Sequence, residues 1–194
     1  MARKQQVRKQ SVGKKTAPKQ PAQKPSGGQH ASSAPAGPSP GTKAPPFSLP
    51  QDGGGTVSLA DFGGRTLVLY FYPRADTPGC TKEAIDFSRL RGDFGRANSD
   101  ILGVSADPVP ALAKFKAKHK LGITLASDEK HRMLEAYGVW REKSLYGRKF
   151  LGIVRTTFLI GADGRIAKVW PKVSVDGHAA EVLAAAKALR QNPL

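Results

Sequence analysis

The stretch TLVLYFYPRADTPGCTKEAIDF, residues 66–87, decides the fold of this chain. It opens with a near-continuous apolar run, Thr66 to Tyr72, which is typical of a strand buried on both faces of a sheet. A Pro-Gly break follows, and apolar residues then recur with helical spacing from Thr81. A buried strand that leads through a short loop into a helix indicates an α/β domain.

Short apolar runs and helical patterns alternate from Ala44 onward. The predicted elements are, in order, strands 57–59 and 66–72, helix 81–90, strand 101–105, helix 110–120, strand 123–126, helix 128–137 with Ser127 as its cap, strands 156–160 and 165–170, and helix 176–190. This order predicts an α/β fold with a mixed central β-sheet and helices on both faces. The segment before Arg155, which holds Trp140, Tyr146 and Phe150, is expected to be a long loop.

The charge of the chain is unevenly distributed. The 194 residues carry 31 Lys and Arg against 15 Asp and Glu, a formal net charge of +16. Nine of the cations and no acid lie in residues 1–43, which contain no aromatic residue and, as branched aliphatic residues, only Val7 and Val12. Such a segment lacks the apolar area that would offset its chain entropy. We therefore expect residues 1–43 to be a disordered basic tail and linker, and residues 44–194 to form one domain.

Two roles for the tail stay open. Residues 1–24 can attach the domain to a polyanion, most simply nucleic acid, by neutralising phosphates and releasing counterions. The other role is that of a solvated spacer, which the lack of aromatic residues for base stacking favours. A transit peptide would also be basic, but it should form an amphipathic helix, and this segment has too few apolar residues for one.

Composition excludes several classes of protein. The single cysteine, Cys80, rules out an internal disulfide and favours a reducing compartment. The longest strongly apolar run, Leu67 to Tyr72, is far shorter than a membrane-spanning helix, and a secretory signal is not apparent. We expect a cytoplasmic protein, or a nuclear or organellar one if the source is eukaryotic, with no membrane partner, no cofactor and no metal.

Cys80 lies where the strongest strand gives way to a helix. The unpaired N–H groups and the positive end of the dipole at a helix N-terminus favour a thiolate. The Pro-Gly break places Cys80 outside any apolar stripe, and small or polar residues flank it. A buried, inert cysteine is the alternative, and the position by itself leaves both open.

Pro73, Thr77 and Cys80 form the pattern Pro-x-x-x-Thr-x-x-Cys, which resembles the active-site motif of the peroxiredoxins. The surrounding YPRADTPGCTKEAIDF is similar to the peroxiredoxin Q group, also called the bacterioferritin comigratory proteins. GVSADPVPALAKFKAKHKL, LASD and GIVRTTFLI recur in that group in the same order, so the resemblance covers roughly residues 41–190. It implies a thioredoxin-like fold and a thiol peroxidase that reduces hydrogen peroxide and organic hydroperoxides.

The resemblance also implies a role for each motif residue. Cys80 would be the nucleophile that becomes a sulfenic acid. Thr77 would hold the thiolate and the peroxide by its hydroxyl, and Pro73 would shield the pocket from water. Arg155 matches the active-site arginine, whose charge stabilises the thiolate and the departing oxygen. Glu83 either orients an arginine or is an exposed acid in the first helical turn.

The chain departs from the group at one position. Many members carry a second cysteine five residues after the first, where this chain has Ile85. The resemblance therefore implies a one-cysteine mechanism, in which thioredoxin, glutaredoxin or glutathione reduces the sulfenic acid. It also implies a monomer. The alternative function is a nucleic-acid-associated protein that is bound through its tail and uses the thioredoxin-like domain as an oxidant sensor.

Overall fold

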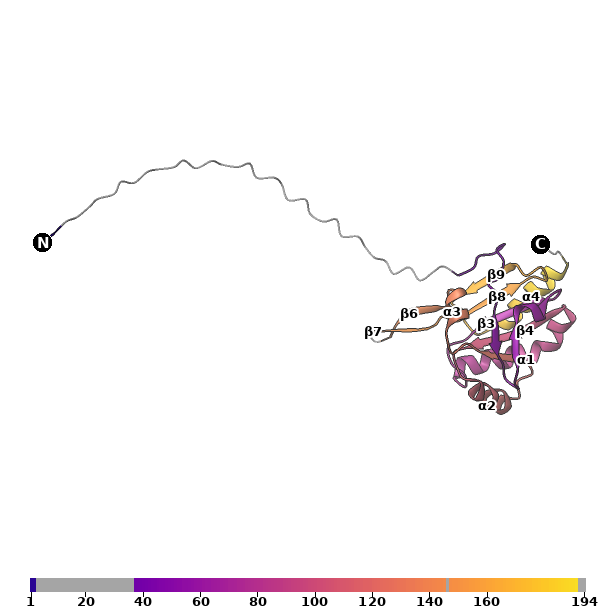
Figure 1. Ribbon diagram of the computed structural model, residues 1–194. Coiled ribbons are helices and arrows are strands. Elements are labelled where there is room, and N and C mark those ends of the chain that lie inside the picture. Colours follow the sequence, from indigo (N-terminus) through magenta and orange to yellow (C-terminus); the bar gives the residue numbers. More distant parts are fainter. Residues whose placement is uncertain (3–36, 146, 192–194) are drawn as a thin grey trace. The chain divides into compact units, whose positions relative to one another are not determined.

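The computed structural model describes residues 1–2, 37–145 and 147–191 (Figure 1). Most of the predicted disordered tail therefore lies outside the described residues, and its disorder stays a prediction. The chain divides into Met1–Ser32 and Ser33–Leu194, and the second unit holds every helix and strand named below. Its hydrogen bonds begin before residue 44, because the N–H of Gly41 donates to the carbonyl of Ile166 at 2.8 Å.

A five-stranded mixed sheet forms the centre of the domain, with the strand order β5-β4-β3-β8-β9. Its strands are β3 (Thr66–Phe71), β4 (Ser99–Ser105), β5 (Thr124–Ser127), β8 (Thr156–Ile160) and β9 (Ile166–Pro171). The central strand β3 runs parallel to β4 and antiparallel to β8. All six residues of β3 are buried, as its apolar run predicts. The structure confirms the predicted mixed α/β sheet.

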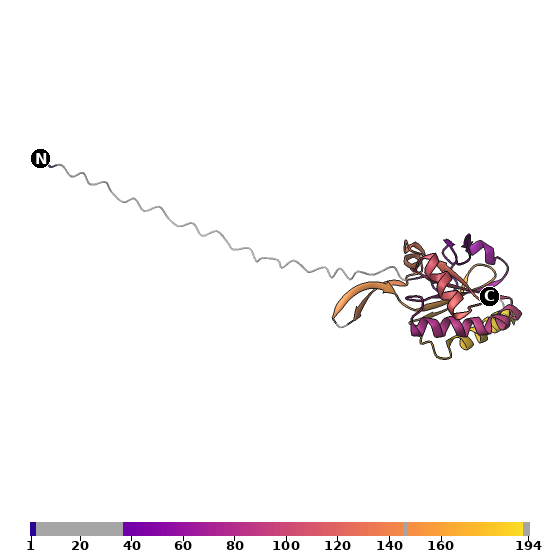
Figure 2. The same cartoon turned by 90° about the horizontal axis from the view of Figure 1, so that it is seen from below.

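Helices cover both faces of this sheet, as predicted. They are α1 (Pro78–Arg96), α2 (Val109–His119), α3 (Arg132–Ala136) and α4 (His178–Gln191). Successive side chains of β3 alternate between two apolar clusters, because strand residues point to opposite faces. Tyr70 packs with α1, α2 and α4, whereas Leu69 and Phe71 pack with α3 on the other face. The helices α1 and α4 lie side by side (Figure 2).

Two hairpins were not predicted. The strands β1 (Ser48–Pro50) and β2 (Thr56–Ser58) pair antiparallel, and the 3-10 helix Leu59–Phe62 follows them. The strands β6 (Trp140–Leu145) and β7 (Arg148–Ile153) form a second hairpin that projects from the domain (Figure 1). The expectation of a long loop before Arg155 was therefore wrong. Much of this hairpin lies outside the core, so its strands lack the apolar alternation that reveals a half-buried strand.

The predicted helix 128–137 was too long. The observed α3 has five residues, and Ser127 belongs to β5 instead of capping the helix. His131 is the N-cap residue and makes no capping hydrogen bond with its side chain, while the buried carboxylate of Asp128 accepts the first-turn N–H of Leu134 at 2.8 Å. In contrast, α1 extends to Arg96, well beyond the predicted end at residue 90. Within the described residues, no helix has the length and apolarity to cross a bilayer.

His178 provides a test of the core. Its ring is buried, lies 2.8 Å from the Thr157 hydroxyl oxygen, and packs edge-on against Phe87. Burial lowers the pKa of His178 to about 4, and the nearby Arg155 adds to that effect while Glu181 opposes it. Between about pH 4 and pH 6.5, the imidazole is therefore neutral in the folded protein, whereas the same histidine in the unfolded chain binds a proton.

We expect the contribution of His178 to the free energy of unfolding to be complete above about pH 6.5 and to fall by about 2 kcal/mol as the pH drops towards 4, whereas Glu83, whose pKa burial raises to about 7, contributes in the opposite direction. Urea unfolding at pH 7.5 and pH 4.5 measures this loss. On going from pH 7.5 to pH 4.5, His178→Asn should lose less free energy of unfolding than wild type loses. His131→Asn, at a half-buried histidine outside this core cluster, serves as the control. An equal pH difference in wild type and His178→Asn contradicts the prediction.

Candidate active site

Cys80 lies in the first turn of α1, immediately after the loop that leaves β3. Thr77 is the N-cap residue with an extended backbone (φ −99°, ψ 153°), and Pro78 occupies the first helical position. Proline suits that position because it has no N–H to leave unpaired and its φ is already helical. The Cys80 thiol is free and only 2% exposed. The loop thus places a buried sulfur in the first turn of α1.

Arg155 brings a positive charge to this sulfur from a distant part of the sequence. It lies in the short link between β7 and β8, and its Nη2 donates to Cys80 Sγ at 3.2 Å. The carbonyl of Arg155 accepts the N–H of Val173 at 3.0 Å, which fixes its backbone. A Cβ at Gly79 would lie only 3.4 Å from Arg155 Nη2, so glycine leaves the guanidinium room beside the helix start.

Glu83 holds the other side of the guanidinium. It follows Cys80 by three residues, which puts both side chains on the same side of α1. The Glu83 carboxylate is 1% exposed and accepts a hydrogen bond from Arg155 Nη1. Burial raises the pKa of Glu83 to about 7, although Arg155 counteracts the rise. The structure therefore supports the interpretation in which Glu83 orients an arginine, and excludes that of an exposed acid.

The other two motif residues lie in the loop before α1. The Thr77 hydroxyl donates to the carbonyl of Arg74 at 3.0 Å, and Thr77 is half-buried. Since that bond uses the hydroxyl proton, the Thr77 oxygen keeps its lone pairs for a donor in the pocket. Pro73 is exposed at the start of the loop. The roles predicted for both residues stay predictions.

Two carboxylates fasten this loop. Asp107 accepts the N–H of Ala75 at 2.7 Å. Asp76, whose backbone has a φ of 58°, pairs with Lys118 at 2.6 Å and with His119 at 2.7 Å. The hydrogen bonds from His119 and Lys118 lower the pKa of Asp76. These contacts tie the loop to the segment after β4 and to α2.

Two tyrosines, one in β3 and one directly after it, belong to the same apolar cluster as Cys80. Tyr70 and Tyr72 are fully buried, and the Tyr70 ring stacks on Phe87 with ring centroids 4.8 Å apart. Burial raises the pKa of Tyr70 and of Tyr72 above the ordinary tyrosine value. Both phenols are therefore neutral near pH 7.

Among the described residues, no cluster of His, Cys, Asp or Glu is suited to hold a metal ion.

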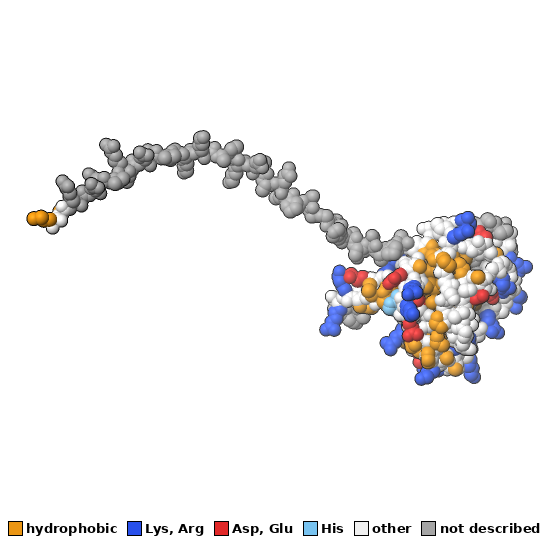
Figure 3. Space-filling model, viewed as in Figure 1, with side chains coloured by type: hydrophobic (Ala, Val, Ile, Leu, Met, Phe, Trp, Pro, Cys, Tyr) orange, Lys and Arg blue, Asp and Glu red, His pale blue; other side chains and the backbone are white. Residues whose placement is uncertain are grey.

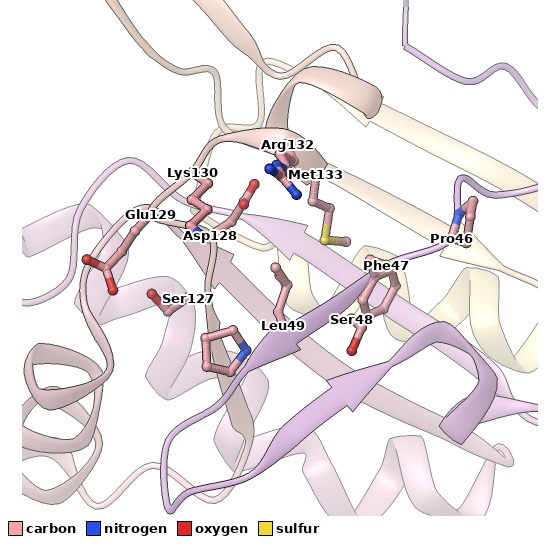
Figure 4. Close-up of a pocket in the computed structure, with 11 residues that line it drawn as sticks. Pro46, Phe47, Ser48, Leu49, Ser127, Asp128, Glu129, Lys130, Arg132 and Met133 are labelled. Atoms are coloured by element: carbon pink, nitrogen blue, oxygen red, sulfur yellow. The ribbon is translucent and has the colours of Figure 1, made fainter.

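A separate cavity of about 480 Å³ opens between β1 and the start of α3 (Figure 4). Phe47, Leu49 and Met133 form its apolar part, and Glu129 and Lys130 lie at its edge. Its apolar residues belong to the cluster on the α3 face of the sheet, whereas Cys80 belongs to the cluster on the α1 face. This cavity is thus not part of the cysteine site.

Comparison with known proteins assigns the arrangement to a family. Residues 40–169 match the AhpC/TSA family. The chain belongs to the AhpC/TSA family. A putative peroxiredoxin Bcp of Coxiella burnetii is 50% identical over 141 residues, which are 73% of this chain and 93% of that relative. The identification confirms the thioredoxin-like fold and the predicted class of enzyme, because peroxiredoxins are thiol-dependent peroxidases.

Solved structures of this AhpC/TSA group agree. Peroxiredoxin Q of Xanthomonas campestris is 43% identical, with a TM-score of 0.72 over 74% of this chain and 91% of that one. A structure of the bacterioferritin comigratory protein of Xanthomonas campestris, described for its alkyl peroxide reduction activity, is 42% identical and also has a TM-score of 0.72, over 74% and 92%. This chain is therefore a peroxiredoxin of the Q group with a single cysteine.

Glu83→Gln should lower peroxidase kcat/KM by about tenfold to a hundredfold, because Arg155 loses the charged partner that orients it beside Cys80. Asp86→Asn is the matched control, since Asp86 lies on the same helix and pairs with Lys82 at the surface. It should keep kcat/KM within about twofold of wild type. Steady-state peroxide consumption by the folded variants gives these kcat/KM values. If Glu83→Gln keeps more than half of the wild-type kcat/KM, the carboxylate does not orient Arg155.

Proposed function

We propose that this peroxiredoxin is a one-cysteine peroxidase that reduces hydrogen peroxide and organic hydroperoxides through a Cys80 sulfenic acid. The observation that carries the proposal is the hydrogen bond from Arg155 Nη2 to Cys80 Sγ, 3.2 Å long, at the start of α1. A fixed guanidinium and the free N–H groups of a helix start both stabilise a thiolate. The alkyl peroxide reduction named for a relative supports the organic hydroperoxides.

The oxidative step is a displacement at oxygen. The Cys80 thiolate attacks one peroxide oxygen, so that an S–O bond forms as the O–O bond breaks. The departing oxygen takes the electron pair and a proton, and leaves as water or an alcohol. The thiol is thereby oxidised to a sulfenic acid and the peroxide is reduced. Arg155 stabilises the negative charge on the departing oxygen, Thr77 positions the peroxide, and Pro73 limits access of water.

The reductive step requires a thiol from outside the chain. All 194 residues contain only Cys80, and Ile85 stands where a second cysteine would lie on α1. An external thiol attacks the sulfenic sulfur and releases water, and a second thiol then frees Cys80 as a disulfide of the reductant forms. Thioredoxin, glutaredoxin or glutathione can supply these thiols. We further propose that the enzyme acts as a monomer in the cytoplasm.

Replacement of Cys80 by Ser should abolish turnover of hydrogen peroxide in the presence of dithiothreitol, because serine forms no sulfenic acid. Peroxide consumption by the intact protein and by Cys80→Ser, under identical conditions, tests this. Arg155→Lys keeps a cation but loses the guanidinium whose two nitrogens contact Glu83 and Cys80 at once. It should retain a residual rate, reduced by about a hundredfold. Equal consumption by wild type and Cys80→Ser would refute the proposed mechanism.

A second candidate function rests on the tail, because residues 1–43 carry nine cations and no acid. Attachment to nucleic acid would release counterions and would weaken steeply with salt. We expect the full chain to shift duplex DNA in a gel at 50 mM salt but not at 300 mM. Deletion of residues 1–36 should remove the shift and leave peroxidase activity unchanged. A shift that survives the deletion contradicts a role of the tail in binding.

A further inference from the structure

The projecting hairpin has two faces of different character. Figure 3 shows Lys and Arg side chains on it beside acidic and hydrophobic ones. Residues directly opposite each other on paired strands share a face. Lys149 and Glu142 are on one face and form an ion pair of 3.0 Å. Lys143 is on the other face, opposite Phe150, which is 45% exposed.

Lys143 turns back from this face towards the domain. Its Nζ donates to the carbonyl of Ile153 at 2.5 Å, two residues before Arg155. Its stem passes over Gly152, where an added Cβ would lie 3.4 Å from the Lys143 Cδ. The ammonium is thereby held at the end of β7, where the chain passes to the guanidinium that contacts Cys80.

Electrostatics agree with this placement. Burial lowers the pKa of Lys143, the positive charge of Arg155 lowers it further, and the charge of Cys80 raises it. Both effects agree with the position of the ammonium on the Ile153 carbonyl, two residues from Arg155. In the sequence, Lys143 carries no signal that separates it from a solvated lysine of a polar loop.

The sum of the charges at the site suggests what the Lys143 ammonium does there. When ionised, Glu83 offsets the charge of Arg155, and the phenols of Tyr70 and Tyr72 are neutral. The thiolate would then give the site a net negative charge. Within the described ranges, no carboxylate forms an ion pair with Lys143. Its ammonium is therefore available to balance the thiolate.

We propose that Lys143 is a positioning residue of the thiolate site. Its ammonium is anchored on the carbonyl of Ile153 and balances the charge of the Cys80 thiolate beside Arg155. The site thereby accepts anionic hydroperoxides as substrates. This inference rests on the proposed function for its substrate class. Without Lys143, a negative hydroperoxide would meet a negative pocket. A neutral peroxide would be affected far less, because it carries no net charge for the ammonium to attract.

Iodoacetate and iodoacetamide test the proposal without any peroxide, because they are similar in size and differ in charge. With either reagent the Cys80 sulfur displaces iodide from a CH₂ group, so that an S–C bond forms as the C–I bond breaks. Both reactions need the same thiolate. The ratio of the two alkylation rates therefore cancels the thiolate fraction and reports the charge around the sulfur.

Lys143→Gln should lower the iodoacetate-to-iodoacetamide rate ratio by about threefold to tenfold, as expected for one charge at this range. Lys143→Met is a second neutral variant, which keeps the stem packed on Gly152 if glutamine impairs folding. Lys143→Arg keeps the charge and should restore the ratio. Lys149→Gln is the matched control, a cation of the same hairpin on the opposite face.

A ratio within twofold of wild type in the folded neutral variants overturns the proposal. So does an equal fall in Lys149→Gln, because the effect would then belong to the net charge of the hairpin. The outcome is separable from the fate of the proposed function. Loss of peroxidase activity in wild type would refute the function, whereas the alkylation ratio would still report on Lys143.

Discussion

The guanidinium of Arg155 lies between the carboxylate of Glu83 and the sulfur of Cys80, and all three are largely withdrawn from water. Removing such charges from water costs several kcal/mol for each ion, and the cost is recovered only if the partners are held in good geometry. The elements around the trio meet this demand. The first two turns of α1 supply two of its members, and the β7–β8 link supplies the third.

The register of the sheet makes the meeting of these segments possible. β3 and β8 run antiparallel, and Phe71 at the end of β3 lies opposite Thr156 at the start of β8. The loop to Cys80 therefore leaves the sheet at the same edge at which Arg155 enters it. A slip of one residue would send every side chain of a strand to the opposite face, so the positions of Cys80 and Arg155 depend on this register.

The single cysteine fits the rigidity of the site. In a two-cysteine chain whose second cysteine lies on the same helix, disulfide formation would require the buried sulfur to leave its position. Here the loop is fastened by Asp76 and Asp107, and the proposed chemistry asks no movement of Cys80 towards another residue of the chain. In the proposed mechanism, the external thiol meets the sulfenic acid where it forms. The cavity beside α3 lies on the other face of the sheet and takes no part.

The sequence by itself determined the α/β class, the central strand, the position of Cys80 at a helix start and, through its motif, the family. These features are encoded locally, because an apolar run, a Pro-Gly break and short residue spacings can each be read from a short stretch of sequence without knowing its tertiary contacts. It left Glu83 undecided and gave no sign of β6, β7 or Lys143. Only the tertiary structure decided these, because the burial of Glu83 depends on an arginine 72 residues away, and a hairpin lying largely outside the core follows the pairing of its two strands instead of an apolar pattern.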